Sequence, residues 1–136
     1  MQQRSIATEI ISTMTTEPKR VLIIDDEKEI CSLLTECFTE GGYAVEVAYD
    51  GEDGIVKAKS FGPDIIILDH RMPTMGGSQV IRMVREFCDT PIICVSAIND
   101  QSAVDECLKL GASEYMFKPI NLEELERAIE SALKEK

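Results

Sequence analysis

The chain has 136 residues, enough for one domain with a buried core and too few for two domains of ordinary size. Its composition, 44% hydrophobic and 29% charged, is typical of a globular protein and excludes a disordered or fibrous chain. The net charge of −11 argues against nucleic-acid binding, and no apolar stretch approaches the roughly 18 residues of a membrane-spanning helix.

The first segment, residues 1–18, lacks the pattern of the rest of the chain. Ile6, Ile10, Ile11 and Met14 could line one face of a short helix, but the Ser and Thr residues around them are poor helix formers. A flexible tail and a short docking or dimerising helix both stay open as alternatives. The segment has no continuous apolar run, so we expect no signal peptide and a cytoplasmic location.

From Lys19 onward, short apolar runs alternate with amphipathic stretches. The runs are residues 20–25, 44–49, 64–69, 91–96 and 114–117. Three of them are almost wholly aliphatic, as expected of parallel strands buried on both faces. The second contains Glu46, which indicates an edge strand.

The stretches that follow these runs have helical spacing, because apolar residues recur every three or four positions. The apolar positions are Ile30, Leu33, Leu34, Cys37 and Phe38; Val80, Ile81, Val84 and Phe87; Val104, Cys107 and Leu108; and Leu122, Leu125, Ile129 and Leu133. Ile55, Ala58 and Lys59 make a short and weaker second helix. Residues 41–42 (Gly-Gly) end the first helix and Gly111 the fourth, while Asn121 begins the fifth. Five strand–helix units predict an α/β fold of three layers over residues 19–136.

The cysteines indicate a reducing environment. Their positions are Cys31, Cys37, Cys88, Cys94 and Cys107. No two of them form a C-x-x-C pair, and four lie on apolar stripes or strands, so we interpret them as buried apolar side chains. Because His70 is the only histidine, we do not expect a zinc site.

Residues with reactive or charged side chains lie at the carboxyl ends of the predicted strands. Asp25 and Asp26 end the first strand, and Asp69 ends the third. Ser96 ends the fourth, and Lys118 follows the fifth. These ends meet at one edge of a parallel sheet, where ligands bind. An acidic turn alone would be an ordinary solvated turn, but the combination with a lysine indicates a functional cleft.

Phosphoryl chemistry explains this combination of residue types. Carboxylates that converge in one cleft raise each other's pKa unless a cation lies among them, and Mg²⁺ with oxygen ligands is the natural choice. Lys118, Ser96 and the metal can each hold one equatorial oxygen of a phosphoryl group, while an aspartate attacks in line. Asn99 and Asp100 are better helix caps than Ser96, which leaves its hydroxyl for the cleft.

The segments VLIIDDE, IIILDHRMP, VSA and YMFKP, in this order, resemble the receiver domain of two-component response regulators, from about Arg20 to Ala132. The resemblance implies a flavodoxin-like, doubly wound fold with five parallel strands in the order 2-1-3-4-5 and five helices. It implies a stand-alone receiver, a signalling module and not an enzyme, which phosphorylates itself from small phosphodonors and slowly hydrolyses the product. We expect no output domain after the fifth helix.

The resemblance also gives roles to the acids. Asp69 matches the aspartate that accepts the phosphoryl group from the phosphohistidine of a histidine kinase. Asp26 matches the acid that ligates Mg²⁺ directly, and Asp25 the acid that usually acts through water. Arg71 matches the residue whose backbone carbonyl completes the metal site.

Three further residues match positions that hold the phosphoryl group or form the switch of the family, the switch being Ser96 and Tyr115. Ser96 and Lys118 match the hydroxyl and the lysine that hold the phosphoryl oxygens. Tyr115 matches the aromatic residue that swings inward when the hydroxyl residue moves, although its ring could equally be core packing. The bond between Lys118 and Pro119 matches a peptide bond that is usually cis.

The sequence departs from the family pattern at Gly76, where an acid or amide is frequent, and at His70. Gly76 is expected to alter the start of the third helix. Strand alternation points His70 away from the Asp69 side chain, so a structural or solvent-facing role is expected, with tuning of the phosphoryl lifetime as the alternative.

The partners that the resemblance implies are a sensor histidine kinase or a histidine phosphotransfer protein, and a downstream protein that binds the fourth helix, fifth strand and fifth helix. We expect neither nucleic acid nor membrane as a partner. Whether the chain is the end point of its pathway or passes the phosphoryl group on in a phosphorelay stays open, as does homodimerisation.

Three other functions fit less well. A phosphatase of the haloacid dehalogenase type needs a second aspartate two residues after the nucleophile, where Arg71 stands. A flavin or nucleotide binder needs a glycine-rich loop after the first strand, and the loop here is acidic. A receiver that acts without phosphorylation has no positive support, because every expected site residue is present.

Overall fold

The computed structural model describes residues 17–134, so the two alternatives for the N-terminal segment concern residues that lie almost wholly outside the described part. The strands of this part are β1 (Arg20–Ile24), β2 (Ala44–Ala48), β3 (Ile65–Leu68), β4 (Ile92–Ser96) and β5 (Glu114–Phe117). The helices are α2 (Lys28–Glu40), α3 (Gly51–Ser60), α4 (Gly77–Arg85), α5 (Gln101–Leu110) and α6 (Leu122–Lys134). All ten elements lie where the sequence predicts them.

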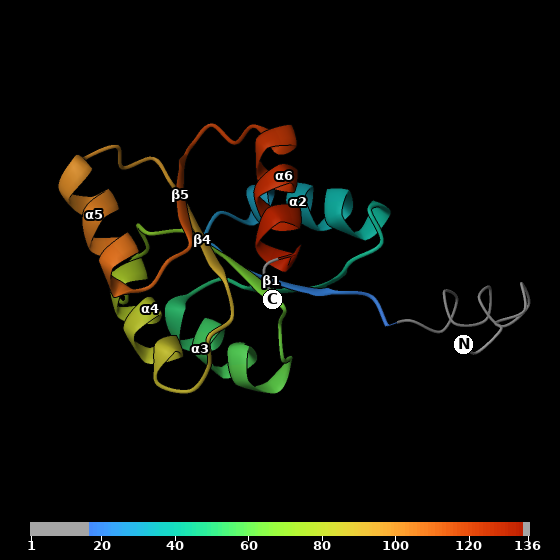
Figure 1. Cartoon of the computed structure of the whole chain (residues 1–136), viewed down its shortest axis with the longest axis horizontal. Helices are drawn as coiled ribbons and strands as arrows, with labels where there is room; N and C mark the ends of the chain where they lie inside the picture. Colours follow the sequence, from blue (N-terminus) through green and yellow to red (C-terminus); the bar gives the residue numbers. More distant parts are fainter. Residues whose placement is uncertain (1–16, 135–136) are drawn as a thin grey trace, which may run out of the picture.

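The strands form one parallel sheet in the order β2-β1-β3-β4-β5. Helices α2 and α6 cover one face of the sheet, and α3, α4 and α5 cover the other (Figure 1). This is the three-layer, doubly wound fold that the sequence predicts, with β2 at an edge. Among residues 17–134, no helix combines the length and the apolar character that crossing a bilayer requires.

The sheet separates two apolar cores. Along β1, Val21 and Ile23 face α2 and α6, whereas Leu22 and Ile24 face α3, α4 and α5. All four side chains are fully buried. Burying each aliphatic side chain contributes about 1.5–3 kcal/mol relative to leaving it exposed, so the central strands supply much of the stability.

The ends of two helices confirm the predicted caps. Asp100 begins α5 and its side chain accepts a hydrogen bond from the backbone N–H of Ser102 at 3.1 Å. Gly111 ends that helix with a φ of 119°, the left-handed conformation that favours glycine. Asn121 precedes α6 and its Oδ1 accepts from the N–H of Glu124 at 3.0 Å.

Three apolar positions were predicted on buried helix faces and are exposed. Leu33 is 51% exposed, because the buried face of α2 is centred on Cys31, Leu34 and Phe38. Phe87 lies beyond the end of α4 and is 38% exposed. Leu108 is 42% exposed, because the buried face of α5 is centred on Cys107 alone.

Candidate functional site

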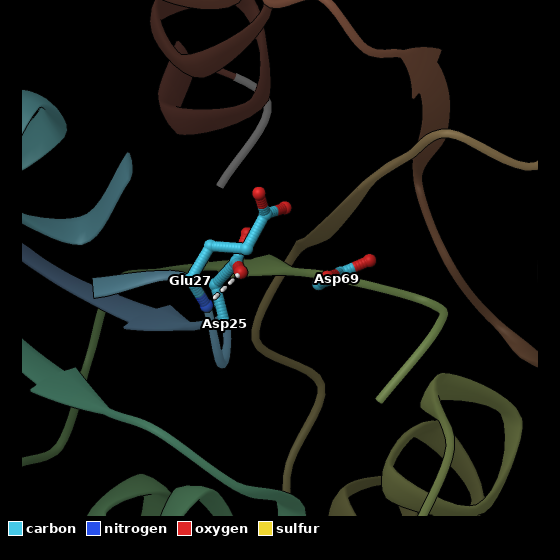
Figure 2. A group of neighbouring side chains, drawn as sticks. All are labelled: Asp25, Glu27 and Asp69. Atoms are coloured by element: carbon cyan, nitrogen blue, oxygen red, sulfur yellow. Dashed lines mark hydrogen bonds between the residues drawn. The ribbon is translucent and has the colours of Figure 1, made fainter. Parts of the chain in front are cut away.

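The carboxyl ends of β1 and β3 bring two aspartates side by side. Ile24 and Leu68 are paired in the sheet, and the residues that follow them are Asp25 and Asp69. The backbone N–H of Asp69 donates to the carbonyl of Ile24 at 2.9 Å, which fixes this register. Both aspartates are almost fully buried, each with 4% of its surface exposed. Figure 2 shows Asp25 and Glu27 after β1 and Asp69 after β3.

Lys118 joins these acids from the other side of the cleft. Its N–H donates to the carbonyl of Ser96 at 2.9 Å, which continues the β4–β5 pairing. Its ammonium donates to Oδ2 of Asp25 at 3.0 Å, to Oε1 of Glu27 at 2.5 Å and to Oδ2 of Asp69 at 3.3 Å. One lysine therefore contacts three carboxylates that lie up to 44 positions apart in the sequence (69 − 25).

The cleft around these groups is a cavity of about 460 Å³. It is lined by Asp26, Glu27, Asp69, Arg71, Met72, Pro73, Ala97 and Lys118. A hollow of about 580 Å³ lies elsewhere, between α2 and β2. Its lining includes Glu36 and Glu40 but no basic residue, so we place the chemistry in the smaller cleft.

Burial dominates the electrostatics of the two aspartates. Desolvation raises the pKa of Asp25 to about 6, although the N–H of Glu27 and the Lys118 ammonium lower it. Desolvation likewise raises the pKa of Asp69. The N–H of Arg71, which donates to Oδ1 of Asp69 at 3.0 Å, and the Lys118 ammonium both lower this pKa. Burial acts to lower the pKa of Lys118, but hydrogen bonds to Glu27 and Asp25 outweigh it and raise the pKa above its ordinary value.

The acids offer oxygen donors in a geometry that suits a hard cation. One carboxylate oxygen each from Asp25, Glu27 and Asp69 lies within 4.8 Å of the others. An all-oxygen set of this kind fits Mg²⁺, which takes one or two carboxylates and keeps several waters. A divalent ion would also offset the repulsion between the acids, which adds to the effect of burial in raising the pKa of both aspartates.

The structure distributes the predicted metal ligands unevenly. It brings Asp25 and Asp69 into the close group and places Asp26 and Arg71 on the wall of the cleft, with exposed side chains. Glu27 belongs to the close group, although neither the strand pattern nor the family resemblance indicates it as a ligand. Its position directly after two aspartates was the available signal. The two-residue spacing also lets the N–H of Glu27 donate to Oδ1 of Asp25 at 2.8 Å.

Ser96 and Tyr115 lie on either side of the same loop. Ser96 is fully buried at the end of β4, and its Oγ accepts from the N–H of Ile98 at 3.3 Å. Tyr115 is partly buried, and its hydroxyl donates to the carbonyl of Ile98 at 2.9 Å. Burial raises the pKa of Tyr115, while its hydrogen bond with Ser96 lowers it. The peptide bond between Lys118 and Pro119 is cis, as predicted.

The two departures from the expected pattern both affect the start of α4. Gly76 is its N-cap and provides no side-chain hydrogen bond. His70 is partly buried and its Nδ1 lies 3.3 Å from Sγ of Cys107. It therefore has a structural contact away from the acids. Burial lowers the pKa of His70 and so favours the neutral imidazole, while the negative charge of Glu106 raises this pKa by a smaller amount.

Comparison with known proteins agrees with this geometry. The profile of the family described as response regulator receiver domain matches residues 21–130. The response regulator ArlR of Staphylococcus aureus is 36% identical over 115 residues, which are 85% of this chain and 52% of that protein. The chain thus spans about half the length of the relatives of this kind that it matches.

Solved structures give the same result for the fold. A CheY-like response regulator receiver domain protein from Methanospirillum hungatei has a TM-score of 0.84 and 26% identity, over 87% of this chain and 95% of that one. CheY in a CheX–CheY–BeF₃–Mg complex from Borrelia burgdorferi has a TM-score of 0.81 and 32% identity, over 88% of this chain and 92% of that one. Both likenesses extend over nearly all of the described residues.

Proposed function

Since this chain belongs to the response regulator receiver domain family, we propose that it is a phosphorylation-dependent switch in which Asp69 accepts a phosphoryl group. Receiver domains are signalling modules and not classical enzymes. The observation that carries the proposal is the contact of Lys118 with both buried aspartates, Asp25 and Asp69, in one cleft. We assign residues 19–136 to the receiver domain.

Each side chain of the cleft has a distinct part in the proposed transfer. A carboxylate oxygen of Asp69 attacks the phosphorus of a phosphohistidine, the phosphorus–nitrogen bond breaks, and its electron pair returns to the imidazole. The Lys118 ammonium and the Ser96 hydroxyl neutralise and orient the phosphoryl oxygens. The N–H of Arg71, which donates to Oδ1 of Asp69, holds the other carboxylate oxygen and fixes the attacking one.

Asp25, Asp26 and Asp69, with the backbone carbonyl of Arg71, would hold Mg²⁺ in this cleft. When bound, the ion supplies positive charge to the phosphoryl oxygens and offsets the repulsion between the carboxylates. Glu27 is a further candidate, because its carboxylate joins the close group of acids. The related CheY from Borrelia burgdorferi was solved as a complex that contains BeF₃ and Mg, which supports Mg²⁺ as the ion that this cleft would hold.

The phosphoryl donor would be a sensor histidine kinase or a histidine phosphotransfer protein. Phosphorylation would then change the affinity of the face formed by α5, β5 and α6 for a downstream protein, with Ser96 and Tyr115 as the switch. Passing the group on in a phosphorelay and homodimerisation remain compatible with the same site. We also infer slow self-dephosphorylation and a cytoplasmic location.

Intact mass after incubation with acetyl phosphate tests the proposal. The protein is incubated with Mg²⁺ and, separately, with EDTA, beside the Asp69→Asn variant. We expect a gain of one phosphoryl group that needs Mg²⁺ and is lost in the variant. Labelling of Asp69→Asn to the same extent would disprove the assignment of the acceptor. The absence of labelling in every sample would indicate a receiver that binds partners without phosphorylation.

A further inference from the structure

His70 lies where β3, α4 and α5 meet. It directly follows Asp69, and its carbonyl accepts the N–H of Gly77 at 2.8 Å, at the start of α4. A Cβ at Gly77 would lie 2.6 Å from Cα of His70, so this close approach needs glycine. The backbone of His70 is therefore held tightly against α4, and a shift of Asp69 is passed on to it through one peptide unit.

The side chain of His70 contacts the residue that anchors α5. Cys107 is the only buried residue of this helix, all ten residues of which are described. Its Sγ lies 3.3 Å from Nδ1 of His70. Because the rest of α5 is partly or fully exposed, few other side chains fix its position on the sheet.

The same imidazole lies beside the aromatic residue of the switch. The rings of His70 and Tyr115 are 6.0 Å apart and meet edge to face at 63°. The hydroxyl of Tyr115 donates to the carbonyl of Ile98, whose N–H donates to Oγ of Ser96. Contacts thus continue from Asp69 through His70 and Tyr115 to Ser96, the residue assigned to hold the phosphoryl group.

We propose that His70 is a positioning residue that couples the state of Asp69 to α5 and Tyr115. This inference rests on the proposed function. It concerns the response to phosphorylation and not the transfer itself, because His70 is not among the described residues that line the acidic cleft. In this role, the imidazole transmits a movement at the end of β3 to the single buried side chain of α5.

Two measurements on the same samples test the coupling. Intact mass gives the extent of labelling by acetyl phosphate with Mg²⁺, and amide hydrogen exchange gives the response of residues 101–110 to labelling. We expect His70→Ala to be labelled to within about twofold of the natural chain, while its exchange response falls at least threefold. If His70 only fills space, His70→Ala lowers the stability of the labelled and unlabelled protein equally. The difference in α5 exchange between the labelled and unlabelled protein then stays unchanged.

Leu108→Ala is the matched control, because Leu108 lies next to Cys107 in α5 but is exposed. It should keep the full exchange response. Cys107→Ala removes the other side of the contact and should lose as much of the response as His70→Ala. The double variant should lose no more than either single variant, since both remove one contact.

The outcomes separate this inference from the proposed function. Failure of the natural chain to label would disprove the proposed function, and the coupling with it. Two outcomes would overturn the coupling alone. In the first, His70→Ala is labelled normally and its exchange response in α5 is unchanged. In the second, the natural chain is labelled normally but α5 shows no exchange response. If circular dichroism shows that His70→Ala does not fold, His70→Phe replaces it, because phenylalanine keeps a ring but lacks Nδ1. A full response in both His70→Phe and Cys107→Ala would then overturn the inference.

Discussion

The ammonium of Lys118 lies 3.0 Å from Oδ2 of Asp25, although 93 positions separate the two residues in the sequence. The contact joins the end of β1 to the residue that follows β5, across the intervening β3 and β4. It is also largely removed from solvent, since the two side chains are 11% and 6% exposed. A charge pair in this position affects both the stability of the fold and the chemistry of the cleft.

The stability of the protein should depend on pH in a way that shows the raised pKa of Asp25. Its pKa is raised to about 6 in the folded protein from an ordinary 3.8, so the folded state binds a proton more tightly than the unfolded state. The contribution of Asp25 to stability therefore increases as the pH falls from 7 toward 4 and decreases as the pH rises through 6. Urea unfolding without Mg²⁺ measures this effect. On going from pH 7 to pH 5, the free energy of unfolding should receive a stabilising contribution in the natural chain that is smaller in Asp25→Asn. An equal gain in both proteins would contradict the prediction.

Removing the lysine should destabilise the cleft. In Lys118→Ala the buried Asp25 and Asp69 lose their shared cation, so we expect the free energy of unfolding at pH 7 in EDTA to fall by about 1–3 kcal/mol. Mg²⁺ should restore part of this loss. Acetyl phosphate should still label the variant, but without the normal exchange response in α5. Lys109→Ala is the control, because Lys109 is exposed on α5 and should leave stability nearly unchanged. Equal stability of the two variants in EDTA would count against the role of Lys118.

Two neighbouring acids should differ in their effect on Mg²⁺ binding. We expect Asp26→Asn to weaken binding at least tenfold, because Asp26 is assigned as a direct ligand. Glu27→Gln should weaken it less, roughly threefold or below, because Glu27 is not assigned as a direct ligand and acts only through a charge that solvent screens, its side chain being 55% exposed. Isothermal titration calorimetry with MgCl₂ measures both. The opposite order would make Glu27 the direct ligand and move Asp26 to the rim of the site.

Adjacent leucines of α2 provide a test of the packing. Leu34 is 1% exposed, whereas Leu33 is 51% exposed. Leu34→Ala should reduce the free energy of unfolding by about 2–5 kcal/mol, because it leaves a cavity against the sheet. Leu33→Ala should cost less than about 1 kcal/mol. Urea titration of the two variants checks the assignment, and similar losses would show that the buried face of α2 is wider than described.

The strand pattern predicted the sheet well because its central strands are buried on both faces and are therefore continuously aliphatic. The polar residues at the strand ends followed from the same topology, since parallel strands end at one edge. The helix faces were harder to predict. Periodicity placed Leu33 and Leu108 inside, but the choice between adjacent apolar residues depends on how each helix is rotated on the sheet, which only tertiary packing decides.

The contacts within the site were predictable only in part. That Asp25, Asp69 and Lys118 would converge followed from their strands, whereas the inclusion of Glu27 depends on the conformation of a turn. The contacts of His70 could also not be predicted from the sequence. Alternation indicated the direction of its side chain, but the approach of Cys107 and Tyr115 depends on where α5 lies.

The division of the interior by the sheet has a consequence for how such a protein can change in evolution. Leu34 on α2 and Val80 on α4 belong to different cores, with a layer of backbone between them. Substitutions in separate, non-contacting regions have nearly additive effects, within about 0.5 kcal/mol. Each side of the molecule can therefore accumulate substitutions with little dependence on the other. The surface above α2 and α6 can diverge toward one set of partners while that above α3, α4 and α5 diverges toward another.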